Sequence, residues 1–366
     1  MNPPSRFHHC LALLACFYAP VILSAAPLTL HPQASPLPTD KQGPFIRLTD
    51  GRIMTAEGRT AVFSSDEGKT WTATPMFNAK TPFEISRERT ILLTTDGSII
   101  VACMNLKERV WKWNSKANEA ETGTRLPTYV LRSEDAGKTW DTPRLMHEAW
   151  TGAVRDIAQL RSGRILFVSQ YLAPNPSRHV TITYSSNDDG KTWKPSNVLD
   201  LGGHGHHDGA IEGTIEELRD GRVRLLLRTT REAFWNAWSD DGVYWTSFEK
   251  SDIPAATAPA ILERLKSGRL VMLWNQLYPE GKTRYPKSGG KSAWSERPAS
   301  NHRGELSIAF SDNEGSTWSN PVVVARKPGA SLAYPYVFEA KPGRLWVTTM
   351  QGGIRLQLDE EDFLAR

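Results

Sequence analysis

The sequence predicts an all-β chain, a six-bladed β-propeller of four-stranded antiparallel blades, because two short signals recur and alternate along it. The first signal is the pattern Ser-x-Asp-x-Gly-x-x-Trp, which is intact at residues 64–71, 133–140 and 186–193. Looser copies follow at 238–245, where Trp replaces Ser, and at 311–318, where Asn replaces Asp. Repeats at this kind of spacing are typical of propellers and solenoids.

The second signal is a Gly-centred turn between apolar stretches, found at 50–51, 96–97, 162–163, 220–221, 267–268 and 342–343. An x-Gly pair between β-rich runs predicts a tight hairpin, although Pro342 cannot adopt the positive φ of a type I′ turn. Six such turns alternate with five motifs. Each unit is therefore expected to run strand 1, x-Gly turn, strand 2, loop, strand 3, motif turn and strand 4.

The sixth unit has no motif turn, so we expect the N-terminal segment to supply its outer strand, with residues 28–30 as the candidate. We assign residues 1–26 to a signal peptide, 27–43 to a linker with this possible ring-closing strand, and 44–366 to the propeller domain. The leader reading rests on a basic start, the apolar run 10–23 and small residues up to Ala26. It predicts a secreted or periplasmic protein. A lipoprotein site at Cys16 is the less favoured alternative, because the apolar segment before it is short.

Each residue type of the repeated motif has a local physical reason. Ser and Asp side chains bind the backbone amides of a turn, Gly supplies positive φ, and Trp fills an apolar gap beside the turn. The motif resembles the Asp-box, or BNR repeat, of sialidases and other β-propellers. This resemblance covers nearly the whole mature chain and is specific for a fold rather than for a function.

Composition excludes some classes of function. The formal net charge is +4, charged residues are 23% of the chain, and there is no basic run or zinc-ligand spacing. Nucleic-acid binding is therefore not expected. Pro20 interrupts the leader's apolar run, so we expect no membrane span. Cys103 is the only cysteine outside the leader, which predicts no internal disulfide. We expect a monomer.

The repeat also predicts where polar residues gather. Both turns of each blade lie at one face, and strands rise about 3.3 Å per residue, so residues some seven to nine positions from a turn reach the opposite face. Asp156, six positions from its turn, is included beside Arg155. The polar residues that satisfy this distance, and should surround one opening, are Arg87, Arg155, Asp156, Glu212, Arg228, Arg303 and Tyr334.

A group of Arg, Glu and Tyr at a propeller mouth suggests a chemistry. Converging guanidiniums bind a carboxylate through charge-assisted hydrogen bonds. A Tyr beside a Glu can lose its proton to the Glu and attack an anomeric carbon, and a neutral phenol suits a reacting carbon that bears a carboxylate. Glu216 or Glu217 are alternatives to Glu212, which could instead cap a strand end.

Four of these positions resemble the site of the sialidase family. In that family a Glu and an Arg stand about sixteen residues apart in the fourth blade, an Arg opens strand 3 of the fifth, and a Tyr starts the sixth. Glu212, Arg228, Arg303 and Tyr334 match in blade, strand and residue type. The resemblance implies Tyr334 as nucleophile, Glu212 as its base, and Arg228 and Arg303 as carboxylate ligands, with no cofactor.

Blade 1 departs from the family. Its Arg47 lies only three residues before Asp50, too close to the turn to reach the mouth, and the short loop at 56–59 contains no Asp. The long insertion is in blade 2, at 105–128. From position alone, we predict Arg87 (or Arg89) as the third guanidinium and Asp156 as the acid.

Two loops are expected at the mouth. Residues 203–208, Gly-His-Gly-His-His-Asp, predict a polar rim loop with His207 as a substrate-binding residue. A metal site or an acid–base His remain alternatives for it, and His at i and i+2 is a weak ligand pattern. Residues 275–301 predict a lid or a sugar-stacking surface.

The sequence thus predicts an exo-acting glycosidase that removes a terminal acidic sugar, sialic acid or a related one, from glycans. One alternative keeps the propeller but makes it a hydrolase or lyase of uronic-acid polysaccharide, using His206 or His207 with Tyr334. Another is a carbohydrate-binding propeller without turnover. The shortened blade 1 favours the hydrolase or lyase alternative, and Asp-boxes alone do not argue against the binding propeller.

Overall fold

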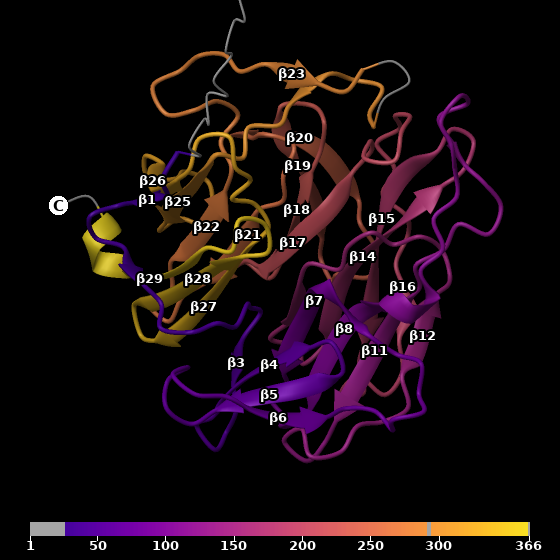
Figure 1. Ribbon diagram of the computed structural model, residues 1–366, viewed down its shortest axis with the longest axis vertical. Coiled ribbons are helices and arrows are strands. Elements are labelled where there is room, and N and C mark those ends of the chain that lie inside the picture. Colours follow the sequence, from indigo (N-terminus) through magenta and orange to yellow (C-terminus); the bar gives the residue numbers. More distant parts are fainter. Residues whose placement is uncertain (1–25, 291–293, 365–366) are drawn as a thin grey trace, which may run out of the picture.

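The computed structural model describes residues 26–290 and 294–364, and it confirms the predicted six-bladed propeller. Six antiparallel sheets surround a common centre (Figure 1), and the yellow sixth blade lies beside the indigo first blade, so the ring is closed. The leader predicted at 1–26, with Cys16, lies outside the described residues except for Ala26. Within the described ranges, no helix is long and apolar enough to cross a membrane.

The strands of the blades follow in chain order. Blade 1 contains β3 (Ile46–Arg47), β4 (Ile53–Glu57), β5 (Thr60–Ser64) and β6 (Thr72–Pro75). Blade 2 contains β7 (Ile85–Leu93), β8 (Ile99–Asn105), β11 (Thr128–Ser133) and β12 (Arg144–His147). Blade 3 contains β13 (Ile157–Gln159), β14 (Ile165–Ala173), β15 (Arg178–Ser186) and β16 (Lys194–Pro195).

Blade 4 contains β17 (Ile211–Glu217), β18 (Val223–Arg228), β19 (Ala233–Ser239) and β20 (Ser247–Pro254). Blade 5 contains β21 (Ile261–Arg264), β22 (Leu270–Trp274), β25 (Glu305–Ser311) and β26 (Val322–Arg326). Blade 6 contains β27 (Pro335–Lys341), β28 (Arg344–Thr349) and β29 (Arg355–Asp359). Small ladders lie in the loops, β9 (Trp113–Asn114) with β10 (Glu119–Ala120) and β23 (Lys287–Ser288) with β24 (Ala299–Ser300), and two short 3₁₀ helices complete the structure, η1 (Leu106–Glu108) and η2 (Glu360–Phe363).

The N-terminal segment closes the ring, but not with the residues expected. The outer strand of blade 6 is β2 (Ser35–Pro36), which pairs with β29. Residues 28–30 were the wrong candidate, because β1 (Thr29–Leu30) pairs with β26 and adds a fifth strand to blade 5. The chain therefore passes the edge of blade 5 before it reaches blade 6 and enters blade 1.

The Asp-box turns have the expected hydrogen bonds. In the second box, the Gly137 amide donates to Ser133 Oγ (3.0 Å) and the Thr139 amide donates to Asp135 Oδ1 (2.8 Å). Ala136 and Gly137 have positive φ values of 58° and 81°. Trp140 packs against the apolar core between blades 1 and 2. Side chains thus replace the backbone partners that the turn lacks.

The fourth box is shifted by one residue from the expected alignment, which paired Trp238 with Ser and Asp240 with Asp. The structure uses Ser239 and Asp241 instead, with the Gly242 amide donating to Ser239 Oγ (2.8 Å) and the Val243 amide donating to Asp241 Oδ1 (2.9 Å). In this turn Ser and Gly are three positions apart instead of four, so the Ser of the motif is residue 239 and not residue 238.

The x-Gly turns are longer than the two-residue turns expected. In blade 1 the Leu48 amide donates to the Arg52 carbonyl (2.8 Å) and the Gly51 amide to the Leu48 carbonyl (2.9 Å), so the loop has three residues and ends on Gly51 at φ 87°. This is the hairpin in which a tight turn precedes one left-handed residue. At Pro342 the loop does have two residues, with Gly343 at φ 75°.

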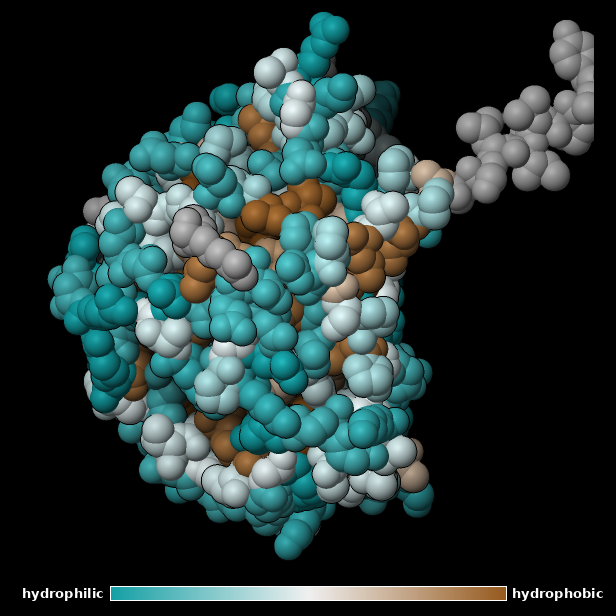
Figure 2. Space-filling view, turned by 90° about the vertical axis from the view of Figure 1, so that its left-hand side faces the viewer, coloured by the Kyte–Doolittle hydropathy of each residue, from teal (hydrophilic) through white to brown (hydrophobic). Residues whose placement is uncertain are grey.

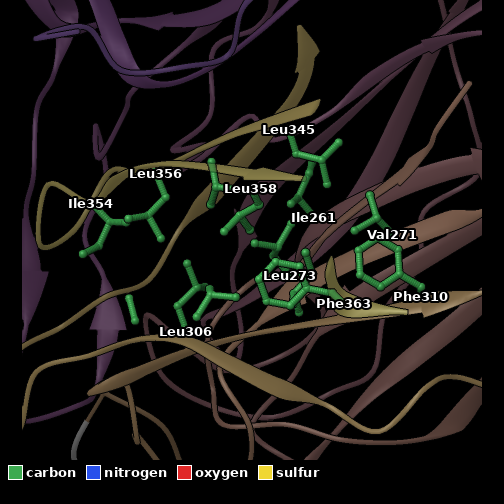
Figure 3. Close-up of a cluster of buried hydrophobic side chains, with 14 of the residues drawn as sticks. Ile261, Val271, Leu273, Leu306, Phe310, Leu345, Ile354, Leu356, Leu358 and Phe363 are labelled. Carbon is green, nitrogen blue, oxygen red and sulfur yellow. The ribbon is translucent and has the colours of Figure 1, made fainter. Parts of the chain in front are cut away.

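The core lies between adjacent blades. Figure 3 shows one such layer, where Ile261 and Leu273 of blade 5 face Leu345 and Leu356 of blade 6. Burying side chains of this kind contributes about 1.5–3 kcal/mol each. On the side of the molecule shown in Figure 2, apolar groups form small patches between hydrophilic ones. Cys103 is buried and free.

Candidate active site

The strand ends opposite both turns bring the predicted polar residues to one face. Glu212 stands in the first strand of blade 4 and Arg228 ends its second strand. Arg303 lies just before β25, and Tyr334 directly precedes β27. These strand ends lie around the propeller axis at one face of the molecule. Residues separated by up to 122 positions in the chain therefore come into contact there.

Three of these side chains form one hydrogen-bonded set. Tyr334 Oη donates to Glu212 Oε1 (2.9 Å). Arg228 Nη1 donates to Glu212 Oε2 (2.6 Å) and lies 3.1 Å from Tyr334 Oη. Their exposures are only 7%, 6% and 2% for Glu212, Tyr334 and Arg228, so the contacts are shielded from solvent. Thr257 Oγ1 accepts from Arg228 Nε (3.0 Å), which leaves Arg228 committed to this set.

The backbone brings the Glu212 and Tyr334 side chains together. Glu212 and Tyr334 both have positive φ, at 52° and 63°. Residues other than glycine rarely adopt this region, and such strain is concentrated at functional sites. Glu212 is held there by its amide, which donates to Gln170 Oε1 (2.6 Å), and by an irregularity in the β17–β18 pairing. The Met350 amide donates to the Tyr334 carbonyl (3.0 Å).

The charges of this set favour a base beside a neutral phenol. Burial alone would raise the pKa of Glu212, but the charge and hydrogen bond of Arg228 outweigh it and hold that pKa below its ordinary value. Burial, and next the Glu212 anion, raise the pKa of Tyr334. At neutral pH, Glu212 is therefore ionised and positioned to accept the phenolic proton.

Two further guanidiniums flank Tyr334. Arg303 Cζ lies 5.6 Å from the centre of the Tyr334 ring, and Arg155 Cζ lies 5.3 Å from it. Arg155 is also 4.4 Å from the Tyr336 ring, so it is stacked between the two tyrosines. Within the described residues, Arg303 Nε, Arg155 Nε and Arg155 Nη1 are buried without an acceptor. Buried charged donors without partners are costly, which favours an anionic ligand here.

Arg87 and Arg89 do not join this group. Arg87 Nη2 donates to the Met350 carbonyl (2.7 Å) and to Gln42 Oε1 (3.1 Å). Arg89 is buried beneath the mouth, where Nη2 donates to the Gln42 carbonyl and to Thr55 Oγ1. The structure places Arg155, rather than Arg87 or Arg89, as the third guanidinium beside Tyr334. Its distance of seven residues from Ser162 was the available signal.

Asp156 is tied to neighbouring backbone and does not touch Glu212 or Tyr334. Its Oδ1 accepts from the Ile157 amide (2.8 Å), and its Oδ2 accepts from Thr214 Oγ1 (2.6 Å) and the Ile215 amide (2.8 Å). Burial raises its pKa to about 6 against the lowering effect of these bonds. This geometry connects blades 3 and 4 and is poorly suited to an exchangeable acid.

Glu88 is a carboxyl group at the mouth that sequence reasoning passed over. It lies where the β7–β8 pairing is irregular. Its carbonyl accepts from Ser86 Oγ (2.6 Å), and its carboxyl group interacts with its own backbone amide. Burial, and after it the nearby Glu212 anion, raise the pKa of Glu88. It stands eight residues before Asp96, so the distance argument that selected the other residues applies to it as well.

The loop at 203–208 is a rim segment. Its His207 amide donates to the Trp294 carbonyl (2.9 Å) of the 275–301 loop, whose strand β23 lies at the top of the molecule in Figure 1. Desolvation of the imidazole by surrounding protein atoms, and next the positive charge of Arg228, lower the pKa of His207. In the part of the chain that the structure describes, no group of three or more His, Cys, Asp or Glu residues is placed to hold a metal ion.

Comparison with known protein families decides the relationship. The model described as a BNR repeat-like domain matches residues 112–347, more than half of the chain. The chain belongs to the BNR repeat-like family. The resemblance to sialidase-type propellers is thereby confirmed for repeat and fold. A search of curated proteins finds no match to this BNR repeat-like protein.

Solved structures share the fold of this BNR repeat-like protein. A protein of unknown function from Dyadobacter fermentans has a TM-score of 0.59 and 20% identity, covering 90% of this chain and 100% of that one. The NanB sialidase of Streptococcus pneumoniae has 0.55 and 14%, covering 90% and 70%. The alpha-L-arabinanase of Penicillium chrysogenum has 0.57 and 12%, covering 87% and 93%. Identities this low establish a common fold and no more.

Proposed function

We propose that this protein is an exo-acting glycosidase that removes a terminal acidic sugar from glycans. The observation that carries the proposal is the buried contact of Tyr334 Oη with Glu212 Oε1 (2.9 Å), beside guanidiniums that lack acceptors. Named structural neighbours that are a sialidase and an arabinanase support a glycosidase of this fold. The leader-like N-terminus supports action on glycans outside the cytoplasm.

The carboxylate of the sugar is held by Arg303 and Arg155. Both carry buried N–H groups without acceptors. Arg228 joins them, because its Nε and Nη1 donate to Thr257, Glu212 and Tyr334 while its Nη2 bonds to no described residue. In this proposal Arg228 positions the nucleophile and its base through Nε and Nη1, and its Nη2 donates to the carboxylate of the sugar.

The reaction proceeds in two displacements. Tyr334 Oη attacks the anomeric carbon as Glu212 takes its proton, and the bond to the leaving-group oxygen breaks while an acid protonates that oxygen. Water then attacks the anomeric carbon and gives a proton to the deprotonated acid, while the tyrosyl–sugar bond breaks and Tyr334 regains its proton from Glu212. We assign the acid role to Glu88, because no other described residue donates to its carboxyl group and burial favours its protonated form, whereas Asp156 is held by three donors.

A substrate comparison tests the proposal. Purified mature protein is offered a fluorogenic sialoside beside a panel of uronic-acid oligosaccharides, with Tyr334→Phe as the control. Release of sialic acid that Tyr334→Phe abolishes is the expected result. Cleavage of uronate chains alone would replace this proposal with a hydrolase or lyase of those polymers. Binding without turnover would leave a carbohydrate-binding propeller.

A further inference from the structure

A second group of side chains lies on the blade 2 and blade 3 side of the mouth and has no role in the proposed chemistry. Trp111 and Trp113 of the blade 2 insertion stack with ring centroids 5.4 Å apart and an interplanar angle of 5°. Trp111 also packs against Trp150, with centroids 4.4 Å apart. The His206 ring of the 203–208 loop packs edge-on against Trp113, with ring centroids 5.2 Å apart. Trp111 remains 39% exposed, so the pile has an open surface.

Three nitrogen atoms, one of them the indole nitrogen of Trp150, surround one small space at Gly152. A Cβ built on Gly152 would lie 3.3 Å from Gln170 Nε2, 3.3 Å from His179 Nε2 and 3.4 Å from Trp150 Nε1. Gly152 has φ 83°, a conformation that other residues rarely adopt, so this space is kept free of a side chain. Gln170 Oε1 accepts from the Glu212 amide, which leaves the amide nitrogen of Gln170 for the space beside Gly152.

His179 shows that a partner belongs in this space. Its exposure is 3%, yet neither ring nitrogen has a hydrogen-bond partner among the described residues. Buried polar atoms are almost always paired, by protein, water or ligand, because an unpaired one is costly. Burial lowers the pKa of His179 to about 4, so the ring is neutral at pH 7 and offers one donor and one acceptor.

The three nitrogens select the kind of ligand. Trp150 and Gln170 present N–H donors and His179 is neutral, so none of the three carries a formal charge at pH 7. Arg109 lies over the face of the Trp150 ring at 5.6 Å. A carboxylate in the cradle would meet no charged group among its three hydrogen-bond partners, whereas an uncharged oxygen needs none. The arginines that suit a carboxylate flank Tyr334 instead.

We propose that this side of the mouth binds a neutral sugar, which places its apolar face on the indole rings and a hydroxyl or acyl oxygen in the cradle of Gln170, His179 and Trp150. Gln170 connects this site to the reaction centre, because its Nε2 lines the cradle while its Oε1 accepts from the Glu212 amide. That this sugar stands next to the terminal acidic sugar of one glycan rests on the proposed function. The binding of a neutral sugar at this site is argued independently of it.

Calorimetric titration of Tyr334→Phe protein, which is expected to bind without turnover, tests the inference. Lactose and N-acetyllactosamine serve as neutral probes and a free uronic acid as the charged one. We expect the neutral probes to bind, and His179→Phe or Trp111→Ala on the same background to weaken binding by about three- to tenfold, the effect of one lost hydrogen bond or contact. Tyr244→Ala is the matched control, because Tyr244 is a 63% exposed aromatic residue at the turn face.

Absence of heat with both neutral probes would overturn the inference, as would equal affinities in all variants. Melting temperatures check folding, and Trp111→Ala decides if the buried His179→Phe variant fails to fold, since Trp111 is partly exposed. The two proposals fail separately. Neutral-sugar binding without hydrolysis of any acidic glycoside would remove the proposed function alone, and hydrolysis without neutral-sugar binding would remove this inference alone.

Discussion

Glu212 and Tyr334 meet in a 2.9 Å hydrogen bond while both residues hold left-handed backbone angles. Each such angle costs about 1–2 kcal/mol for a residue with a Cβ, and persists only where the surroundings impose it. Gln170 holds the Glu212 amide, and Met350 holds the Tyr334 carbonyl. The strain therefore accompanies the one contact that the proposed chemistry needs.

Replacing Tyr334 by Phe should abolish turnover while preserving the fold. The ring remains to stack against Arg155 and Arg303, and Glu212 keeps its bond to Arg228, so only one hydroxyl is lost. We expect the rate with a fluorogenic acidic glycoside to fall by about three to six orders of magnitude, as for other lost nucleophiles. The melting temperature should change by only a few degrees, about the effect of one hydrogen bond. Retained activity would exclude Tyr334 as nucleophile.

Replacing Glu212 by Gln should damage stability as well as activity. Arg228 is 2% exposed, so loss of the carboxylate leaves a buried cation without its countercharge. Breaking such a pair costs about 3–5 kcal/mol. Urea denaturation measures this loss, and adding Arg228→Met to Glu212→Gln should recover much of it. If the double variant is no more stable than Glu212→Gln, the buried pair does not govern stability here.

The pH profile of kcat/KM should be bell-shaped with an acidic optimum. Activity needs Glu212 ionised and Glu88 protonated; the pKa of Glu212 is lowered and that of Glu88 is raised from the ordinary 4.5. Activity therefore rises as pH passes the Glu212 value, below 4.5, and falls as pH passes the Glu88 value, above 4.5. The measurement is kcat/KM from pH 3 to 8.

Glu88→Gln tests which group sets the alkaline limb. This variant should lose that limb and most activity toward a poor leaving group, while Asp156→Asn should keep the limb. An unchanged limb in Glu88→Gln, with its loss in Asp156→Asn, would return the acid role to Asp156.

Glu212 also links folding stability to pH. Because its pKa is lowered in the folded protein, its contribution to the free energy of unfolding is present above pH 4.5 and is lost as pH falls through the lowered pKa.

Arg303 and Arg87 should differ in their effect on substrate binding. Arg303 has a buried Nε without an acceptor, whereas Arg87 already donates to Met350 and Gln42. A hydrogen bond to a charged group is worth about 1.5–3 kcal/mol, so Arg303→Met should lower kcat/KM for an acidic glycoside by about tenfold to two-hundredfold. Arg87→Met should change it by less than about threefold, within the range of surface substitutions. A larger effect at Arg87 would restore it as a carboxylate ligand.

The Asp-boxes should make the fold sensitive to acid. Hydrogen bonds from Thr70 lower the pKa of Asp66 to about 2 from 3.8, so this group's contribution is present above 3.8 and is lost as pH falls toward 2. Asn313 of the fifth box keeps the matching bond from the Thr317 amide without a charge. Asp66→Asn should therefore fold normally at pH 7 and lose less melting temperature than the wild type between pH 5 and 2. Thermal melts across that range measure the difference.

The distance from a turn proved to be the most informative signal in the sequence for the site. It selected Glu212, Arg228 and Tyr334, and the structure joins them in one hydrogen-bonded set. It also excluded Arg47, which binds Glu67 at the turn face. The same signal pointed to Arg155 and Glu88, but residues beside them in the chain, Arg87 and Asp156, were preferred.

The sequence by itself determined the number of blades, the order of their strands and the face at which polar residues meet, because these follow from a local repeat and a fixed rise per residue. The tertiary structure alone decided which side chains touch. Neighbours such as Arg155 and Asp156 leave the backbone in different directions, one stacking on Tyr334 and the other bonding to blade 4. It also decided which donors were already satisfied, a property that depends on packing between blades far apart in sequence.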